Sequence, residues 1–292
     1  MTTIDSAAIA ERFHRDGWAV VRGVFPPAEV AAIRAAIDRL RDWALAIGGN
    51  YRHGNLVTWI DQIGKELLLR GMQWPAHREP VLESVRTDPR MLAIVSGIAG
   101  HDLRQIINQI HWKPPGSPSS VQWHVDRKNR TPAEAFRALE SSYVQTAIAV
   151  DPMVADNGPL LVVQGSHRRS GCLDDRGYNN FARDGLDRAP IHALGFTDAD
   201  IIAIECDPGD VLLWHVDTIH GSDLNRHDRL DRTIYINGYV AARSTMRGNW
   251  AFLAGRPMPL PEIDIPVLIS REDIFAPASL LPSHPGRARF AD

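Results

Sequence analysis

In the first hundred residues, apolar positions recur at intervals of three and four, the spacing of one face of an α-helix. The clearest run starts after Pro27 and ends before Gly48 and Gly49. Proline is favoured in the first turn of a helix and glycine just past its end, so these residues predict the bounds of a long helix. Its apolar positions are Val30, Ile33, Ala36, Ile37 and Leu40.

Two further segments carry start and stop signals of helices. Residues 6–15 begin at a capping residue and are followed by Gly17, and residues 80–99 are followed by Gly100. The run WAVVRGVF, residues 18–25, is predicted to be a strand. The amino-terminal part is therefore expected to be largely helical, with the first strands of a sheet.

From about residue 103 the pattern changes to short β-rich runs separated by Pro, Gly, Asn and Asp, which is typical of an antiparallel barrel or sandwich. Between these runs lie two long polar stretches, 127–141 and 168–200, which are expected to be lids over a site because long loops in compact domains are often functional. The predicted strands are LRQIINQIHW, SVQWHVD, YVQTAIAVDPM, LLVVQG, GDVLLWHV and RTIYINGYVAA.

Length and composition favour one globular domain over all 292 residues, with 44% hydrophobic and 23% charged residues. We divide it into a helical region with the first strands, 1–102, a core with lid insertions, 103–245, and a carboxyl-terminal extension, 246–292. The net charge of -3 provides no basic field, which disfavours nucleic acid and anionic membranes as partners. The oligomeric state is left open.

The two cysteines, Cys172 and Cys206, are far apart and form no CxxC pair, so neither a zinc site nor a disulfide framework is indicated. The first residues lack a basic segment followed by an apolar run, and no stretch approaches the roughly 20 apolar residues that cross a bilayer. A cytoplasmic protein is expected.

The segment QWHVD carries the candidate chemistry. His124 and Asp126 are two residues apart on a predicted strand, so both side chains point to the same face. One imidazole and one carboxylate need a third ligand, and His220, just after the strand GDVLLWHV, is the best candidate. Two imidazoles and one carboxylate leave three positions of an octahedron open, which suits iron(II), with a 2-oxo acid in two of them and O2 in the third.

Four segments together resemble the phytanoyl-CoA dioxygenase family, in the same order, over about residues 10–240. Alone, an HxD pair is weak evidence, but as a set the motifs are specific. The segments are DGWAVVRGVFPPAEV at 16–30, KPPGSPSSVQWHVD at 113–126, DNGPLLVVQGSH at 156–167 and GDVLLWHVDTIHGSDLN at 209–225.

The resemblance implies a mainly β fold, a double-stranded β-helix (jelly roll, cupin-like) with flanking helices. It also implies that iron(II) is bound by the HxD pair, His124 and Asp126, and by the distal histidine, His220. An arginine after that histidine pairs with the far carboxylate of 2-oxoglutarate in the family, and here this role falls to Arg232. Ser222 matches a hydroxyl that helps to hold the same carboxylate.

An arginine suits this role on physical grounds, because its planar guanidinium grips a carboxylate through two parallel charged hydrogen bonds and stays charged when partly buried. Arg232 lies one residue further from the distal histidine than the family pattern suggests. Arg226 and Arg229 stand in the same loop, and Arg229 remains an alternative to Arg232.

Other polar residues are weighed against structural roles. We expect Gln109 and Thr146 to contact 2-oxoglutarate, and we leave open whether His111 lines the pocket. The turn or core roles of residues such as these are more common than catalytic ones. Structural or packing roles are expected for His167, His215, Asp210, Trp123, Trp250 and Phe252; Lys113 and Asn108 are further candidates for the barrel mouth; and Arg127, Lys128 and Arg130 either draw an anionic substrate or form a solvated loop.

The function hypothesis is an iron(II) and 2-oxoglutarate-dependent dioxygenase that hydroxylates an unactivated C–H bond of a small anionic or polar molecule, with release of succinate and CO2. Because halogenating relatives replace the carboxylate ligand by a small residue, Asp126 argues against halogenation. Desaturation, cyclisation and epimerisation stay open as alternatives at the same iron site. So do a non-catalytic jelly-roll binding protein and a metalloenzyme, such as an isomerase, that needs no 2-oxo acid.

Overall fold

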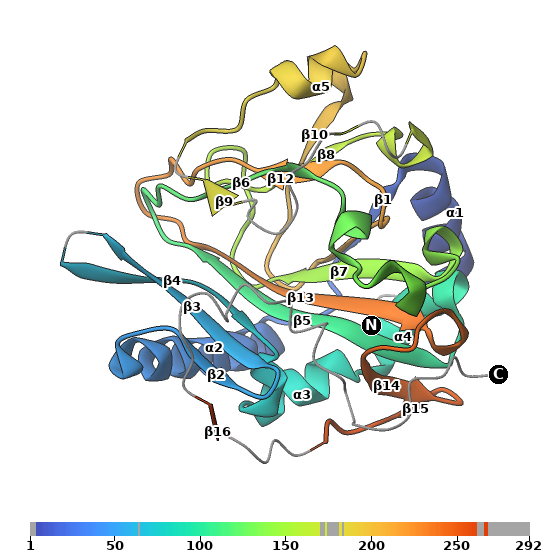
Figure 1. Ribbon diagram of the computed structural model, residues 1–292, viewed down its shortest axis with the longest axis horizontal. Coiled ribbons are helices and arrows are strands. Elements are labelled where there is room, and N and C mark those ends of the chain that lie inside the picture. The colour runs from blue at the N-terminus through green and yellow to red at the C-terminus, as the bar shows by residue number, and fades with distance from the viewer. Residues whose placement is uncertain are drawn as a thin grey trace.

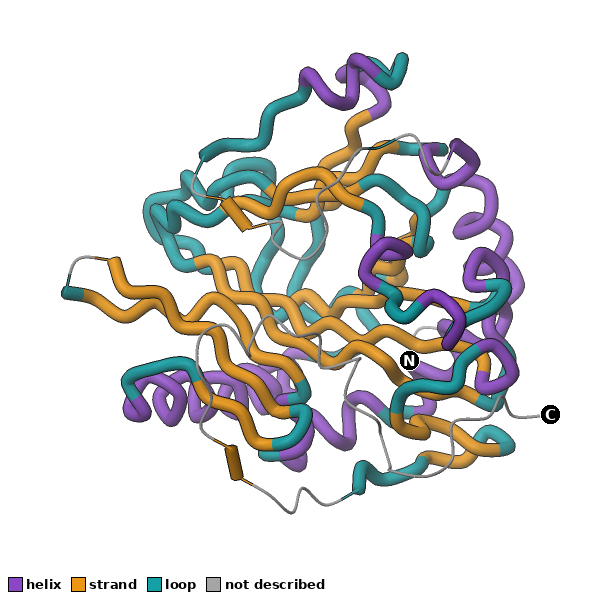
Figure 2. The backbone as a smooth tube through the Cα atoms, viewed as in Figure 1, coloured by secondary structure: helices purple, strands orange, loops and turns teal. Residues whose placement is uncertain are grey.

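Two sheets of antiparallel strands face each other in the computed structural model, the smaller above the larger in Figure 1. Most helices lie below and to the right of the strands, as the purple segments of Figure 2 show. The structure describes residues 4–63, 65–169, 173, 181–182, 184–261 and 266–267.

The larger sheet has the strand order β1-β11-β7-β13-β5-β4-β3-β2-β16, and β14 pairs with β5 and with β15. Its central strands, β5 and β13, are the longest and pair along their whole lengths. The strands are β1 (Trp18–Val21), β2 (Tyr51–His53), β3 (Leu56–Ile63), β4 (Glu66–Gln73), β5 (Leu103–Lys113), β7 (Tyr143–Ala149), β11 (Val211–Trp214), β13 (Arg232–Ala241), β14 (Asn249–Leu253), β15 (Arg256–Pro257) and β16 (Pro266–Val267).

The smaller sheet has the order β10-β8-β12-β6-β9. From β5 to β8 and from β10 to β13, consecutive strands of the chain alternate between the two sheets, which closes them into the predicted jelly roll and confirms the fold class. The strands are β6 (Ser120–His124), β8 (Leu160–Val163), β9 (Phe181–Ala182), β10 (Ile201–Ile204) and β12 (His220–Ser222).

One helix prediction was wrong: the segment 80–99 forms two helices. Asp88 is extended, with φ -62° and ψ 134°, and its carboxylate caps the second helix by accepting from the backbone N–H of Arg90. A residue before proline is driven away from the helical region, so the Asp88-Pro89 pair ends one helix and starts the next. The helices are α1 (Ser6–Asp16), α2 (Pro27–Ile47), α3 (Pro80–Arg86), α4 (Pro89–Ala99) and α5 (Ala189–Ala193).

The strands β2, β3 and β4 were not predicted and extend the larger sheet toward the left of Figure 1. β4 joins the barrel where Gly71 pairs with His111. Gly71 is required there because a Cβ atom would lie 2.8 Å from Cε3 of Trp59. The larger sheet forms the floor of the barrel, and the hairpin extends this floor beyond β5.

Several predictions fall partly on undescribed positions. Cys172, part of the second lid (170–172, 174–180 and 183) and most of the carboxyl-terminal extension lie outside the described residues. The first lid holds three short 3-10 turns, Asp126–Asn129, Ala133–Ala135 and Leu139–Ser141. Among the described helices, none combines the length and the apolar character that crossing a bilayer would need.

The two faces of the larger sheet pack against different partners, because side chains alternate along each strand. Tyr235 and Ile148 face helices α2 and α4 in one apolar cluster. Ile234 and Ile236 face the barrel interior, where they pack with Val162 of the smaller sheet. This alternation decides which side chains can reach a site between the sheets.

Candidate metal centre

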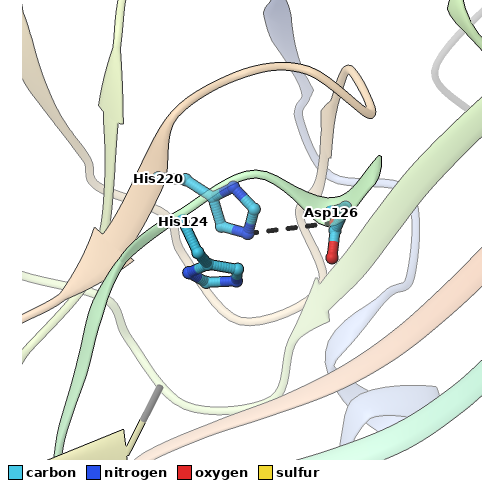
Figure 3. Close-up of side chains that lie close together, drawn as sticks. All are labelled: His124, Asp126 and His220. Atoms are coloured by element: carbon cyan, nitrogen blue, oxygen red, sulfur yellow. Dashed lines mark ion pairs between the residues drawn. The ribbon is translucent and has the colours of Figure 1, made fainter. Parts of the chain in front are cut away.

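Three side chains converge between the sheets, as the sequence predicted. His124 is the last residue of β6, Asp126 begins the turn after it, and His220 is the first residue of the neighbouring strand β12. His124 and His220 are partners in the strand register, which brings the two rings within 4.1 Å of each other, centroid to centroid. One potential ligand atom from each of the three residues lies within 4.8 Å of the others, and Figure 3 shows the rings turned toward Asp126.

Both imidazoles are oriented by the backbone. Nδ1 of His124 lies 2.8 Å from the carbonyl oxygen of Gln122, and Nδ1 of His220 lies 2.9 Å from that of Thr218. With Nδ1–H donating to these carbonyls, each ring presents the lone pair of Nε2. Such a partner on the far nitrogen is the usual support for a metal-binding histidine.

The carboxylate of Asp126 is held on two sides. Trp214 Nε1 donates to Oδ2 at 3.0 Å, and Nη2 of Arg130 lies 3.3 Å from Oδ1. Oδ2 is also 3.9 Å from Nε2 of His220. Burial by itself would raise the pKa of Asp126, but the nearby Arg130 and the two histidines outweigh it, so the pKa is lowered.

The donor set fits a divalent transition metal. Burial, together with His124, lowers the pKa of His220 to about 4, so its ring is neutral near pH 7 and its nitrogen is able to bind metal. Two imidazoles and one ionised carboxylate, all buried, form the two-histidine-one-carboxylate arrangement that leaves positions for other ligands. The triad can therefore hold iron(II).

A second polar group lies at the far end of the interior, where β13 begins and β5 ends. Arg232 is 2% exposed, and its Nε donates to the carbonyl oxygen of Gly158 at 3.0 Å. Its Nη1 is buried and has no hydrogen-bond partner among the described residues. Burial lowers the pKa of Arg232 to about 10, although Asp151 acts to raise it. A buried cationic group with an unused donor fits a carboxylate of a ligand.

Lys113 lies opposite Arg232 in the strand register, at the same end of the interior. Its Nζ donates to Oγ of Ser222 at 2.8 Å and also to the carbonyl oxygens of Ser222 and Asp223. Burial and the charge of Arg232 lower the pKa of Lys113 well below its ordinary value. Since the Ser222 oxygen accepts from Lys113, its hydroxyl hydrogen is left to donate to a ligand.

The rival arginines lie elsewhere. The side chain of Arg229 is 85% exposed beside Asp228. Arg226 forms an ion pair with Asp223 at 2.6 Å and is also largely exposed. Of these three arginines, only Arg232 is buried at the barrel interior.

The predicted 2-oxoglutarate contacts divide by strand face. Gln109 pairs with Ile236 and His111 with Ile234, so both face the interior. Thr146 pairs with Asn237 on the opposite face, and its hydroxyl donates to the carbonyl oxygen of Asn237 at 2.8 Å. The structure therefore places Gln109, but not Thr146, on the face of the larger sheet that points toward the triad. The reason is register: Gln145, not Thr146, has the inward position on β7.

His111 faces the metal side but is unlike the triad. Its pKa is lowered to about 3 by burial and by the charges of Arg232 and Lys113. An imidazole with this pKa is neutral near pH 7 and can line the pocket beside Arg232. Asn108, on the other face, donates to the hydroxyl of Tyr235 and to Asn237, so it belongs to the sheet and the helices behind it.

The remaining candidates make hydrogen bonds, ion pairs or ring contacts within the chain. Asp210 holds Arg22 and the backbone N–H of Gly23, which is the expected turn role. His215 lies within reach of the carbonyl of Glu140, at 2.8 Å. Further ties to the chain are made by His167 to His14, Trp123 to Asp187, Trp250 to Arg104, Phe252 to Tyr239, Arg127 to Asp217 and Glu140, and Lys128 to Leu173.

Comparison with known proteins decides the family. The phytanoyl-CoA dioxygenase (PhyH) profile matches residues 13–234. The chain belongs to the phytanoyl-CoA dioxygenase family. This confirms the resemblance seen in the motifs, and the dioxygenase class that goes with it. Two curated relatives are dioxygenase lolE1 of Epichloe uncinata, 26% identical over 71% of each chain, and the ectoine dioxygenase of Stutzerimonas stutzeri, 25% identical over 75% of this chain and 72% of the relative.

Solved members of the same fold agree with the architecture. EctD from S. alaskensis, crystallised with 2-oxoglutarate and 5-hydroxyectoine, has a TM-score of 0.64 at 21% identity and covers 89% of this chain and 90% of its own. The α-ketoglutarate-dependent carbocyclase SnoK from nogalamycin biosynthesis has a TM-score of 0.61 at 19% identity, covering 87% and 93%. At these identities the match confirms the fold.

Proposed function

We propose that this chain is an iron(II) and 2-oxoglutarate-dependent dioxygenase that hydroxylates an unactivated C–H bond of a small molecule, releasing succinate and CO2. The observation that carries the proposal is the pairing of two sites in one interior. A buried His-Asp-His set can hold the metal, and a buried arginine with an unused donor can hold a carboxylate. A metalloenzyme without a 2-oxo acid has no need of the second site.

The residues divide the work as follows. His124, Asp126 and His220 would hold iron(II), which with 2-oxoglutarate and O2 bound supplies the oxidising power. Arg232 would grip the far carboxylate of 2-oxoglutarate, and the Ser222 hydroxyl, oriented by Lys113, would donate to the same group. The apolar floor, including Ile234 and Ile236, keeps bulk water from the reacting centre.

The substrate side is polar. Gln109 pairs with Gln73 across β5 and β4, and both amides are half-buried and make no hydrogen bond within the described part of the chain. Uncommitted amides beside an apolar floor can donate to and accept from a ligand. We therefore expect a small polar substrate. An anionic one is less favoured, because Arg127 is already neutralised by Asp217 and Glu140.

The family supports more than one outcome at such a site. Among fold neighbours are a carbocyclase and an epimerase from nogalamycin biosynthesis, both named as α-ketoglutarate-dependent. The curated relatives include ectoine dioxygenases, which supports hydroxylation as the leading proposal. Ring closure and epimerisation remain its alternatives.

The direct test is production of succinate. Protein reconstituted without oxygen with iron(II) should, after addition of 2-oxoglutarate and O2, form succinate, and a substrate from a panel of small polar molecules should raise the rate. Asp126→Ala should abolish this turnover while the protein remains folded. Succinate formation that is absent across the panel, or that survives in Asp126→Ala, would contradict the proposal.

A further inference from the structure

A buried arginine stands beside the metal site, at the end of the barrel opposite Arg232. The side chain of Arg130 is only 3% exposed, and its Nη2 lies 3.3 Å from Oδ1 of Asp126. The same nitrogen donates to the hydroxyl of Tyr143 at 2.6 Å, and the guanidinium lies 4.9 Å from the centre of that ring. Tyr143 pairs with Val240, near the end of β13. Arg130 is thus held between a candidate metal ligand and the barrel floor.

The floor is shaped to hold this arginine. The hydroxyl of Tyr143 donates in turn to Oε1 of Gln145, so the donors run in one direction from Arg130 to Gln145. Gly238 lies opposite Gln145, and a Cβ atom there would lie 2.5 Å from the Tyr143 hydroxyl and 2.6 Å from Gln145 Oε1. The absence of a side chain at position 238 therefore leaves the room that the Tyr143–Gln145 pair occupies.

We propose that Arg130 is a positioning residue of the metal centre that makes Asp126 bind through one oxygen only. Arg130 engages Oδ1, whereas Oδ2 is the oxygen nearer to His220 and receives the Trp214 N–H. A carboxylate that bound through both oxygens would occupy one of the three remaining positions of an octahedron. The proposed function needs all three, two for 2-oxoglutarate and one for O2, so this inference rests on that function.

Tyr143 fixes the Arg130 side chain from the barrel floor, so its position does not depend only on the turn after β6. A guanidinium held only by the turn after β6 would have several rotamers, and its hold on Oδ1 would be weak. The hydroxyl and ring of Tyr143 fix it from the floor. Tyr143→Phe keeps the ring and loses the hydroxyl, so it loosens Arg130 without removing its charge.

The experiment measures metal binding without turnover. Binding of Mn(II) is followed by calorimetry, and the visible spectrum of the Co(II)-loaded protein reports the ligand geometry, both without 2-oxoglutarate or O2. Partners of metal ligands typically contribute about 10- to 100-fold to metal affinity, so Arg130→Gln should weaken Mn(II) binding by that factor and change the Co(II) spectrum. Tyr143→Phe should weaken binding about 3-fold in the same direction, and Arg130→Lys should restore part of the loss.

Arg127→Gln is the matched control, since Arg127 lies in the same turn but pairs with Asp217 and Glu140. It should leave the Mn(II) affinity and the Co(II) spectrum unchanged. The proposal is overturned if folded Arg130→Gln matches wild type in both measurements. Should Arg130→Gln fail to fold, an unchanged affinity and spectrum in Tyr143→Phe overturn it instead. Wild-type protein that binds Mn(II) but makes no succinate would sink the proposed function while leaving these readouts valid.

Discussion

The two faces of strands β5, β13 and β7 both bury polar side chains, but they differ in the charge of the groups that are left without a hydrogen-bond partner. On the face toward the helices, Gln105 and Asn108 both donate to Oδ1 of Asn237, at 2.6 and 2.8 Å. On the face toward the metal site, Arg232 keeps a buried donor without a partner within the described chain. Nδ2 of Asn237 is also buried without a partner among the described residues, so the contrast lies in charge. The unpaired donor of Arg232 belongs to a guanidinium, which is costlier to bury unpaired than a neutral amide and therefore indicates an anionic ligand.

The strongest test of this comparison is Arg232→Met. A charged hydrogen bond to a carboxylate contributes about 1.5–3 kcal/mol, so the Kd for 2-oxoglutarate should rise roughly 10- to 100-fold. Because the guanidinium is buried without a full set of partners, its removal should leave the melting temperature unchanged or raise it. Calorimetric titration of the Mn(II)-loaded variant with 2-oxoglutarate and a thermal melt measure the two effects.

Arg229→Met is the control, because that exposed side chain lies outside the interior. Its 2-oxoglutarate affinity should equal that of the wild type. If Arg229→Met weakened binding and Arg232→Met did not, the rival assignment would be correct.

Asn237→Ala, on the helix-facing side, is expected to lower the stability without lowering the affinity for 2-oxoglutarate. The change strands the buried amide donors of Gln105 and Asn108, which should cost about 2 kcal/mol of unfolding free energy. With an unfolding entropy of about 2.1 cal/mol/K per residue, the melting temperature of this 292-residue chain should fall by roughly 3 °C. The affinity for 2-oxoglutarate should stay within 2-fold. If the affinity fell strongly while the stability stayed normal, Asn237 would serve the ligand site, and the proposed difference between the two faces would be wrong.

Ser222→Ala probes the metal-facing side with a smaller change. Its hydroxyl accepts from Lys113 and is expected to donate to the ligand, so its loss should weaken 2-oxoglutarate binding about 5-fold. Metal affinity, measured in the absence of 2-oxoglutarate, should not change. A variant that loses Mn(II) instead would place Ser222 in the support of His220 rather than in the carboxylate site.

The sequence allowed the triad to be found, because HxD on a strand fixes a shared face and the flanking motifs locate the distal histidine. Gln109 lies on the same face of β5 as His111 and Lys113, and its contact with 2-oxoglutarate stays a prediction. The sequence could not show which face of β7 points inward, because all seven of its residues are buried. Without polar and apolar alternation, the inward residue follows only from the register with β13.

Two other features depend on tertiary contacts. The contact of Arg130 with Asp126 depends on how the turn after β6 folds back onto Tyr143, and a local pattern does not encode this. In the sequence, Gly64-Lys65 separates β3 from β4 at the two-residue spacing of a hairpin turn, but the place of this hairpin in the sheet depends on its pairing with β5 at Gly71–Gln73.

Thr146 pairs with Asn237 and faces away from the barrel interior, so a change there is the mildest test of the difference between the two faces. Thr146→Val preserves shape and removes one buried hydroxyl, which donates to the carbonyl oxygen of Asn237. The loss of one neutral hydrogen bond should cost about 1 kcal/mol of unfolding free energy, seen as a small shift in a denaturant melt. The Kd for 2-oxoglutarate should be unchanged, because the hydroxyl points away from Arg232 and the triad. A clear rise in that Kd, with stability intact, would mean that β7 presents its other face to the ligand and that the assigned inward row is wrong.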